Sequence, residues 1–246
     1  MTQSAERVTR AVHQPRAAVR LVCFAHSGAP SGAFYRWAYP LAPDIEVWNA
    51  ILPGRVPQQG EPFATDWAAL VAEFAEAISE TVPRPYALLG QSLGSAVAFE
   101  VTRVLQARGK PPVHLFAAAG AAPDLRASPP VPAGDADLID LVERYYDGIP
   151  AAVLAVPEII EHFLPILRAD LELAAGYRFR PGPPLRLPVT AFAGDRDVSV
   201  PPGTLSAWQR HTTDDCETHR LSGGHFSLAD HLDAALSVIR RRLVGE

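Results

Sequence analysis

One short stretch, Gly90-Gln91-Ser92-Leu93-Gly94, has the residue types and spacing of a nucleophile turn. An apolar run precedes it and helix-compatible residues follow it, so the pattern predicts a strand, a sharp turn and a helix. Glycine on both sides of the turn removes side chains that would collide there. We therefore expect Ser92 to be a nucleophile, with the backbone N–H of Leu93 as one donor to an oxyanion.

A serine nucleophile needs a base and a group that orients the base. In an open α/β sheet such groups follow the carboxyl ends of strands. A strand-like run at 187–193 leads into Gly-Asp-Arg-Asp at 194–197, and a second at 217–221 leads into Gly-Gly-His at 223–225. We expect His225 to be the base. The Gly-x-x-Asp spacing favours Asp197 as its carboxylate, with Asp195 as the alternative.

A second oxyanion donor should come from the loop after the first strong strand. That strand is predicted at 17–25, and the loop reads His26-Ser27-Gly28. Because glycine permits close approach of the backbone, the N–H of Ser27 is the candidate donor. The alternative is a plain turn. His26 could border the site, but it precedes the serine in the chain.

The elements that must position these residues alternate along the chain. Strands are predicted at 17–25, 45–51, 86–91, 113–119, 187–193 and 217–221, and helices at 33–41, 65–80, 92–108, 203–210 and 230–243. This alternation predicts an α/β fold with a mostly parallel sheet and helices on both faces. Residues 1–16 are predicted to be a disordered leader, and 17–246 a single domain.

The segment at about 124–180 interrupts the alternation, because it has helical apolar spacing and no good strand. It falls between the predicted nucleophile and the predicted acid. We expect it to be a helical lid over the site. The alternative is a structural helical layer.

The composition of the chain argues against several classes of function. The net charge of −5 argues against general nucleic-acid binding. Two cysteines form neither a disulfide framework nor a metal-ligand cluster. No apolar run reaches the roughly 20 residues of a membrane span, and no secretory signal is seen. We expect a soluble cytoplasmic protein with no membrane or nucleic-acid partner, and chemistry that needs no metal or organic cofactor.

Motifs along most of the chain resemble the type II thioesterases, the stand-alone editing enzymes of polyketide and nonribosomal peptide assembly lines. The motifs are Cys-Phe-Ala-His-Ser-Gly-Ala (23–29), Phe-Tyr-Arg-Trp (34–37), Leu-Pro-Gly-Arg (52–55), Gly-Gln-Ser-Leu-Gly (90–94), Leu-Pro-Ile-Leu-Arg-Ala-Asp (164–170), Tyr-Arg-Phe (177–179) and Gly-Gly-His-Phe (223–226). The resemblance implies an α/β-hydrolase fold with Ser92, Asp197 and His225 as a triad. It also implies hydrolysis of acyl groups from the phosphopantetheine arm of acyl or peptidyl carrier protein domains.

Two positions depart from the family pattern. Gln91 stands where the family usually has histidine, and the first loop reads Ala-His-Ser-Gly-Ala instead of Pro-His-Ala-Gly-Gly. Two other functions stay open at this point: a carboxylesterase or lipase of the same fold, and a non-catalytic protein that binds carrier proteins. Arg36 and Arg55 are expected near the carboxyl edge of the sheet, where they could contact a carrier protein. The alternative is that both are solvated or structural arginines.

Overall fold

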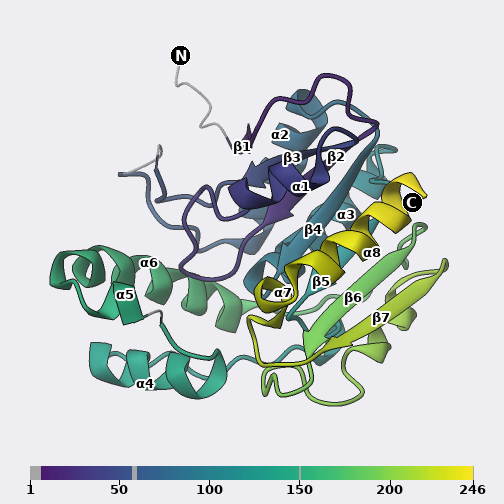
Figure 1. Cartoon of the computed structure of the whole chain (residues 1–246). Helices are drawn as coiled ribbons and strands as arrows, with labels where there is room; N and C mark the ends of the chain where they lie inside the picture. The colour runs from purple at the N-terminus through teal and green to yellow at the C-terminus, as the bar shows by residue number, and fades with distance from the viewer. Residues whose placement is uncertain (1–6, 57–59, 150, 246) are drawn as a thin grey trace.

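The computed structural model describes residues 7–56, 60–149 and 151–245. In this part of the chain, seven strands form one sheet in the order β1-β3-β2-β4-β5-β6-β7 (Figure 1). They are β1 (Val8–Arg10), β2 (Val19–Phe24), β3 (Ile45–Ala50), β4 (Tyr86–Gln91), β5 (Leu115–Ala118), β6 (Val189–Gly194) and β7 (Cys216–Leu221). Strand β1 pairs with β3 in antiparallel register, and the other neighbours are parallel. The expected mostly parallel sheet is confirmed.

The first strand corrects the expectation of a disordered leader over 1–16. Residues 8–10 form β1 at the edge of the sheet, with Val8 opposite Ala50. Val8 is buried in the core, which gives this edge an apolar anchor. A three-residue strand among polar neighbours is too short to show an alternating pattern. Residues 1–6 lie outside the described residues.

Helices follow the strands and cover both faces of the sheet. They are α1 (Ala38–Leu41), α2 (Trp67–Thr81), α3 (Leu93–Ala107), α4 (Asp135–Tyr145), α5 (Ala151–Leu154), α6 (Pro157–Gly176), α7 (Ser227–Asp230) and α8 (Leu232–Val244), with 3₁₀ turns at Tyr35–Trp37, Pro123–Leu125 and Ser206–His211.

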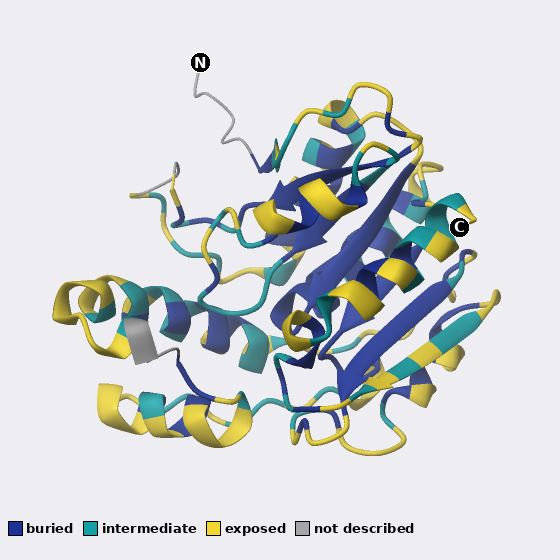
Figure 2. Cartoon of the chain, in the orientation of Figure 1, coloured by how far each residue is buried: buried dark blue, intermediate teal, exposed yellow. Residues whose placement is uncertain are grey.

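Side chains of the strands alternate between two apolar cores. Val22 and Leu88 belong to the core that α2 and α3 cover, whereas Leu21 and Leu89 belong to the core that α1 and α8 cover. Figure 2 shows β3, β4, β5 and β6 buried throughout and the edge strand β7 only partly buried. Two covered faces explain why these strands read as continuous apolar runs.

Helices α4, α5 and α6 lie between β5 and β6 in the chain and group together at one end of the sheet (Figure 1). They share an apolar cluster separate from the two sheet cores, which includes Leu138, Leu141, Leu164 and Leu171. The described residues of 124–180 contain no strand, as expected. Movement of these helices as a lid stays a prediction.

Two expected helices differ in detail. The expected helix at 203–210 is a 3₁₀ helix from Ser206 to His211. It begins later than expected because Gly203 has a left-handed φ of 85°, which is not helical. The last helix is divided into α7 and α8 at His231, whose φ of −116° and ψ of 40° are not helical. Neither difference moves a candidate site residue.

Candidate active site

Ser92 occupies the turn between β4 and α3 in a strained conformation, with φ 54° and ψ −117°. Both glycines of the motif are required by close backbone approach. A Cβ on Gly90 would lie 2.1 Å from the carbonyl oxygen of Gly94, and a Cβ on Gly94 would lie 2.2 Å from that of Phe24. The turn therefore presents the Ser92 side chain at the start of α3.

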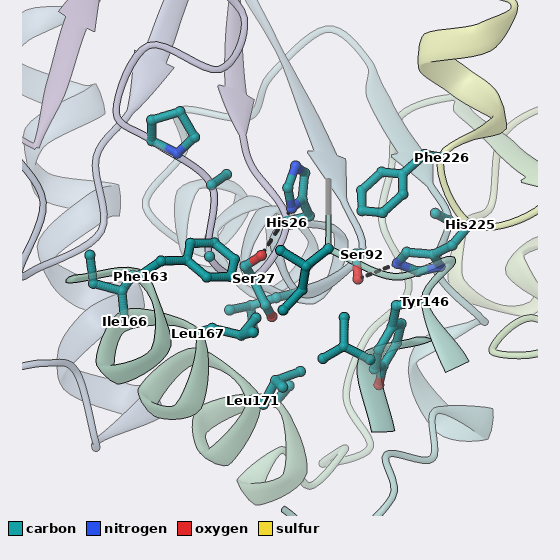
Figure 3. A pocket seen from close by; sticks show the side chains of 18 of the residues that line it. His26, Ser27, Ser92, Tyr146, Phe163, Ile166, Leu167, Leu171, His225 and Phe226 are labelled. Carbon is teal, nitrogen blue, oxygen red and sulfur yellow. Dashed lines mark hydrogen bonds between the residues drawn. The ribbon is translucent and has the colours of Figure 1, made fainter. Parts of the chain in front are cut away.

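The structure brings Ser92, His225 and Asp197 together in one hydrogen-bonded chain. His225 Nε2 lies 2.9 Å from Ser92 Oγ, and His225 Nδ1 lies 3.0 Å from Asp197 Oδ2 (Figure 3). The three residues follow β4, β7 and β6 respectively, and all three are at least nine-tenths buried. The geometry is that of a nucleophile, a base and an orienting carboxylate.

The two candidate aspartates have different neighbours. Asp195 is half exposed and accepts a hydrogen bond from the backbone N–H of Gly223, which fixes the turn before His225. Burial opposes ionisation of Asp197, but hydrogen bonds from His225 and Ser199 together hold its pKa below the ordinary value. Asp197 is therefore an anion beside the imidazole.

Ser199 is a site residue that the sequence reasoning missed. Its hydroxyl donates to Asp197 Oδ1 at 2.6 Å, its backbone N–H donates to the same oxygen at 2.9 Å, and its Oγ lies 3.0 Å from His225 Nδ1. Serine is common in turns, so its type alone gave no signal. Its position two residues after the aspartate was the available clue.

The loop after β2 borders the same space. Ser27 and Leu93 both line the cavity in front of Ser92. The ring of His26 lies there too, and its Nδ1 donates to the carbonyl of Ser27 at 2.9 Å. Burial lowers the pKa of His26 to about 4, so the ring is neutral at pH 7. The roles of the Ser27 and Leu93 amides as oxyanion donors stay predictions.

A cavity of about 860 Å³ opens beside Ser92. Its wall is largely apolar, and α6 contributes Phe163, Ile166, Leu167 and Leu171 on the side opposite the nucleophile (Figure 3). Tyr146, just after α4, packs its ring edge-on against His225 with 4.9 Å between ring centroids. The helical insertion thus forms a wall of the site, and the cavity can enclose an apolar chain.

Arg55 is not a surface residue. It is buried, and its guanidinium forms an ion pair with the buried carboxylate of Asp170 on α6. Of the two alternatives for Arg55, the structural role is the one that the fold supports, and contact with a carrier protein is not. The exposed Arg36 stays a candidate for such a contact.

The fold and the site have counterparts among known proteins. The family model for the thioesterase domain matches residues 19–243. The chain belongs to the thioesterase family. The structure of the type II thioesterase BorB from the borrelidin biosynthetic cluster aligns with 99% of this chain and 100% of its own, at 31% identity and a TM-score of 0.89. The RedJ thioesterase from the prodiginine pathway of Streptomyces coelicolor aligns with 92% of this chain and 87% of its own, at 33% identity and a TM-score of 0.84.

Curated relatives include proteins of similar length and much longer synthetases that contain a similar domain. Thioesterase PikA5 of Streptomyces venezuelae is 37% identical over 88% of this chain and 78% of its own length. The AMB antimetabolite synthetase AmbE of Pseudomonas aeruginosa is 36% identical over 95% of this chain, which spans only 11% of that protein. The resemblance to type II thioesterases and the α/β-hydrolase fold are both confirmed.

The described residues contain no group of three or more His, Cys, Asp or Glu side chains placed to hold a metal ion. No helix among them has the length and apolar character needed to cross a membrane. That the chemistry needs no cofactor stays a prediction.

Proposed function

We propose that this chain is an editing thioesterase that hydrolyses acyl groups from the phosphopantetheine arm of acyl or peptidyl carrier protein domains. The observation that carries the proposal is the Ser92–His225–Asp197 hydrogen-bonded chain at the edge of a large apolar cavity. Family membership supports thioester chemistry. The similarity to discrete type II thioesterases along their full length supports the editing role.

The mechanism follows from the placement of protons. Because Asp197 is ionised, it accepts a hydrogen bond from Nδ1–H of His225 and leaves Nε2 free to take a proton. His225 Nε2 takes the Ser92 proton as Oγ attacks the thioester carbonyl. The amides of Ser27 and Leu93 would hold the resulting oxyanion. The carbon–sulfur bond then breaks, and the thiol leaves with the proton from His225.

The second half of the cycle repeats this sequence with water. His225 takes a proton from a water molecule as the water attacks the acyl-serine ester. The tetrahedral intermediate collapses, Ser92 recovers its proton from His225, and the free acid leaves. The apolar wall from α6 would hold the acyl chain through both halves.

Hydrolysis of a panel of acylated carrier proteins tests the proposal directly. Wild-type protein should release acyl groups and Ser92→Ala should lose on the order of 10⁴-fold or more of the turnover while still folding, because the nucleophile is gone. Ser79→Ala on α2 is a matched control and should keep its activity, since Ser79 Oγ donates to the carbonyl of Ala75 within that helix and lies outside the cavity wall. Retention of a tenth of the activity by Ser92→Ala would exclude Ser92 as the nucleophile.

Two further arms separate the other functions. Faster hydrolysis of oxyesters than of matched thioesters would favour a carboxylesterase. Failure of Ser92 to react with a fluorophosphonate probe would favour a non-catalytic carrier-binding protein.

Recognition of the carrier can be measured with one acyl group on three thiols. We expect a higher kcat/KM on the carrier protein than on coenzyme A or a truncated pantetheine, because protein contacts add to transition-state binding. The net charge of −5 makes overall attraction to an acidic carrier weak, so the contacts must be local. Equal values on all three thiols would show that only the acyl-pantetheine arm is recognised.

A further inference from the structure

Arg126 places a guanidinium in the wall of the catalytic cavity. It follows β5, on the segment that leads into α4. Its Nη2 donates to the backbone carbonyl of Ser92 at 3.0 Å, and its Nη1 donates to Ser95 Oγ at 2.8 Å. A Cβ on Gly120 would lie only 2.7 Å from Nη1, so the cation fills the space beside this glycine. The charge therefore lies next to the nucleophile residue.

No carboxylate among the described residues pairs with Arg126. Its electrostatic neighbours are the phenols of Tyr177 and Tyr146, and burial lowers the pKa of the guanidinium below its ordinary value. Arginine nevertheless stays charged at neutral pH. The other arginine of the cavity wall, Arg55, is neutralised by Asp170. Arg126 is half-buried, and a ligand acceptor that completes the pairing of such a cation gains a charge-assisted hydrogen bond.

Arg126 also has hydrogen-bonding capacity to spare. A guanidinium carries five N–H donors in a planar fork. Two bonds engage protein acceptors, and the remaining donors have none among the described residues. The cavity wall that Arg126 shares is mostly small or apolar, and includes Ala119, Val142 and Leu171. An acceptor for these donors would have to come from the substrate or from water.

We propose that Arg126 binds an oxygen acceptor on the acyl chain, so that the enzyme favours acyl groups with a carboxylate or keto oxygen over alkyl groups of equal length. The inference rests on the proposed thioesterase function and names its substrate class. Because the guanidinium contacts Ser92 itself, the acceptor lies only a few carbons from the reacting carbonyl. An alkyl chain at this position would cover the free donors of Arg126 without pairing them, which is the kind of mismatch that produces strong discrimination.

Two matched pairs of acyl groups on one carrier protein test this. One pair is 3-oxobutanoyl and butanoyl, and the other is succinyl and pentanoyl. Wild-type enzyme should show a higher kcat/KM for the oxygenated member. Arg126→Met keeps the apolar stem and removes the charge, so it should reduce the kcat/KM ratio of oxygenated to alkyl substrate by about ten- to a hundredfold. Arg126→Lys should keep part of the succinyl preference, because it retains a point charge without the fork.

Arg103→Met is the matched control, because Arg103 is also partly buried but pairs with Glu100 and lies outside the cavity wall. It should leave the ratio unchanged. If Arg126 only holds the Ser92 carbonyl, Arg126→Met will slow both members of a pair equally, and the proposal is overturned. A wild-type enzyme without preference in either pair overturns it as well, even if no Arg126 variant folds.

If Arg126→Met lowers the kcat/KM ratio in only one pair, the proposal is supported, and that pair identifies the acceptor as keto or carboxylate. Failure of the wild-type protein to hydrolyse any of the four substrates would instead count against the proposed thioesterase function. The alkyl substrates thus separate the two questions.

Discussion

The carboxylate of Asp170 accepts a hydrogen bond at 2.8 Å from the backbone N–H of Gly28, which lies 142 positions earlier in the chain. The same Oδ2 also accepts from Arg55, and both side chains are buried. Helix α6 of the insertion therefore holds the loop that carries Ser27. The position of the cavity wall and the conformation of the proposed oxyanion loop depend on one side chain.

Asp170→Asn tests this dependence. It leaves Arg55 as an unpaired buried cation, so the free energy of unfolding should fall by about 3–5 kcal/mol, measured by urea denaturation. The kcat of the folded fraction should fall as well. Asp135→Asn breaks the more exposed pair between α4 and Arg168 of α6, and should cost at most about 1 kcal/mol. Similar losses in the two variants would contradict the proposed role of the buried pair.

Asp197→Asn should reduce kcat by on the order of 10⁴-fold, because an amide in place of the carboxylate upsets the tautomer of His225. Asp195→Asn is the control, since Asp195 bonds to the Gly223 backbone and not to the imidazole. Steady-state kinetics on one thioester gives the ranking. A larger loss for Asp195→Asn would show that the orienting carboxylate has been misassigned.

Ser199→Ala should lower kcat by about three- to tenfold with little change in KM, because one hydrogen bond that fixes the Asp197 carboxylate is lost. Ser199→Thr keeps the hydroxyl and should recover most of the rate. Ser206→Ala removes a hydroxyl that bonds only to the exposed turn at Gly203, and should be silent. An effect of Ser199→Ala on thermal stability alone, with kcat unchanged, would limit Ser199 to a structural role.

Stability should depend on pH through the half-buried His26 and the buried His114. Burial lowers the pKa of His26 to about 4 and that of His114 to about 3. An unfolded chain protonates histidine near pH ~6.5, so stability is greatest above that pH and falls as the pH drops towards 4. Each group contributes up to about 1.4 kcal/mol per pH unit in this window.

His114→Gln should therefore flatten the slope of unfolding free energy against pH, measured by urea denaturation between pH ~6.5 and ~4.5. His162→Gln, at an exposed position on α6, is the control and should leave the slope as it is. An unchanged slope in His114→Gln would mean that this ring is protonated in the folded state.

Ile166→Trp should shift the acyl preference towards short chains, because Ile166 projects from α6 into the cavity wall (Figure 3). The measurement is kcat/KM across a series of alkyl thioesters. Glu172→Trp, on an exposed position of the same helix, should leave the length profile unchanged. A flat profile in Ile166→Trp would place the acyl chain elsewhere.

Local patterns explain what the sequence could predict. The turn around Ser92 is formed by five consecutive residues, so the spacing of its two glycines was enough to predict it. His225 and Asp197 could be located because each follows a strand, and parallel strands end at the same edge of the sheet. The parallel sheet and the helical insertion followed from runs long enough to show their periodicity.

Contacts between distant segments explain what the sequence could not predict. The role of Arg55 stayed open in the sequence because its partner Asp170 lies 115 positions away. Ser199 also contacts His225, which lies 26 positions further along the chain. Strand β1 was too short for its pattern to stand out, although Val8 supplies its buried anchor.

The reactive groups and the cavity wall come from different parts of the chain. Strands β4, β6 and β7 carry the reactive groups, whereas one continuous segment between β5 and β6 supplies much of the cavity wall. Substrate range can therefore change by exchange of this segment without redesign of the sheet. A transplanted segment must keep an acid at position 170, because Gly28 and Arg55 of the recipient depend on it. The bonds of Arg126 to Ser92 and Ser95 form a second junction. Chimeras that keep both junctions are the natural starting point for altering acyl selectivity.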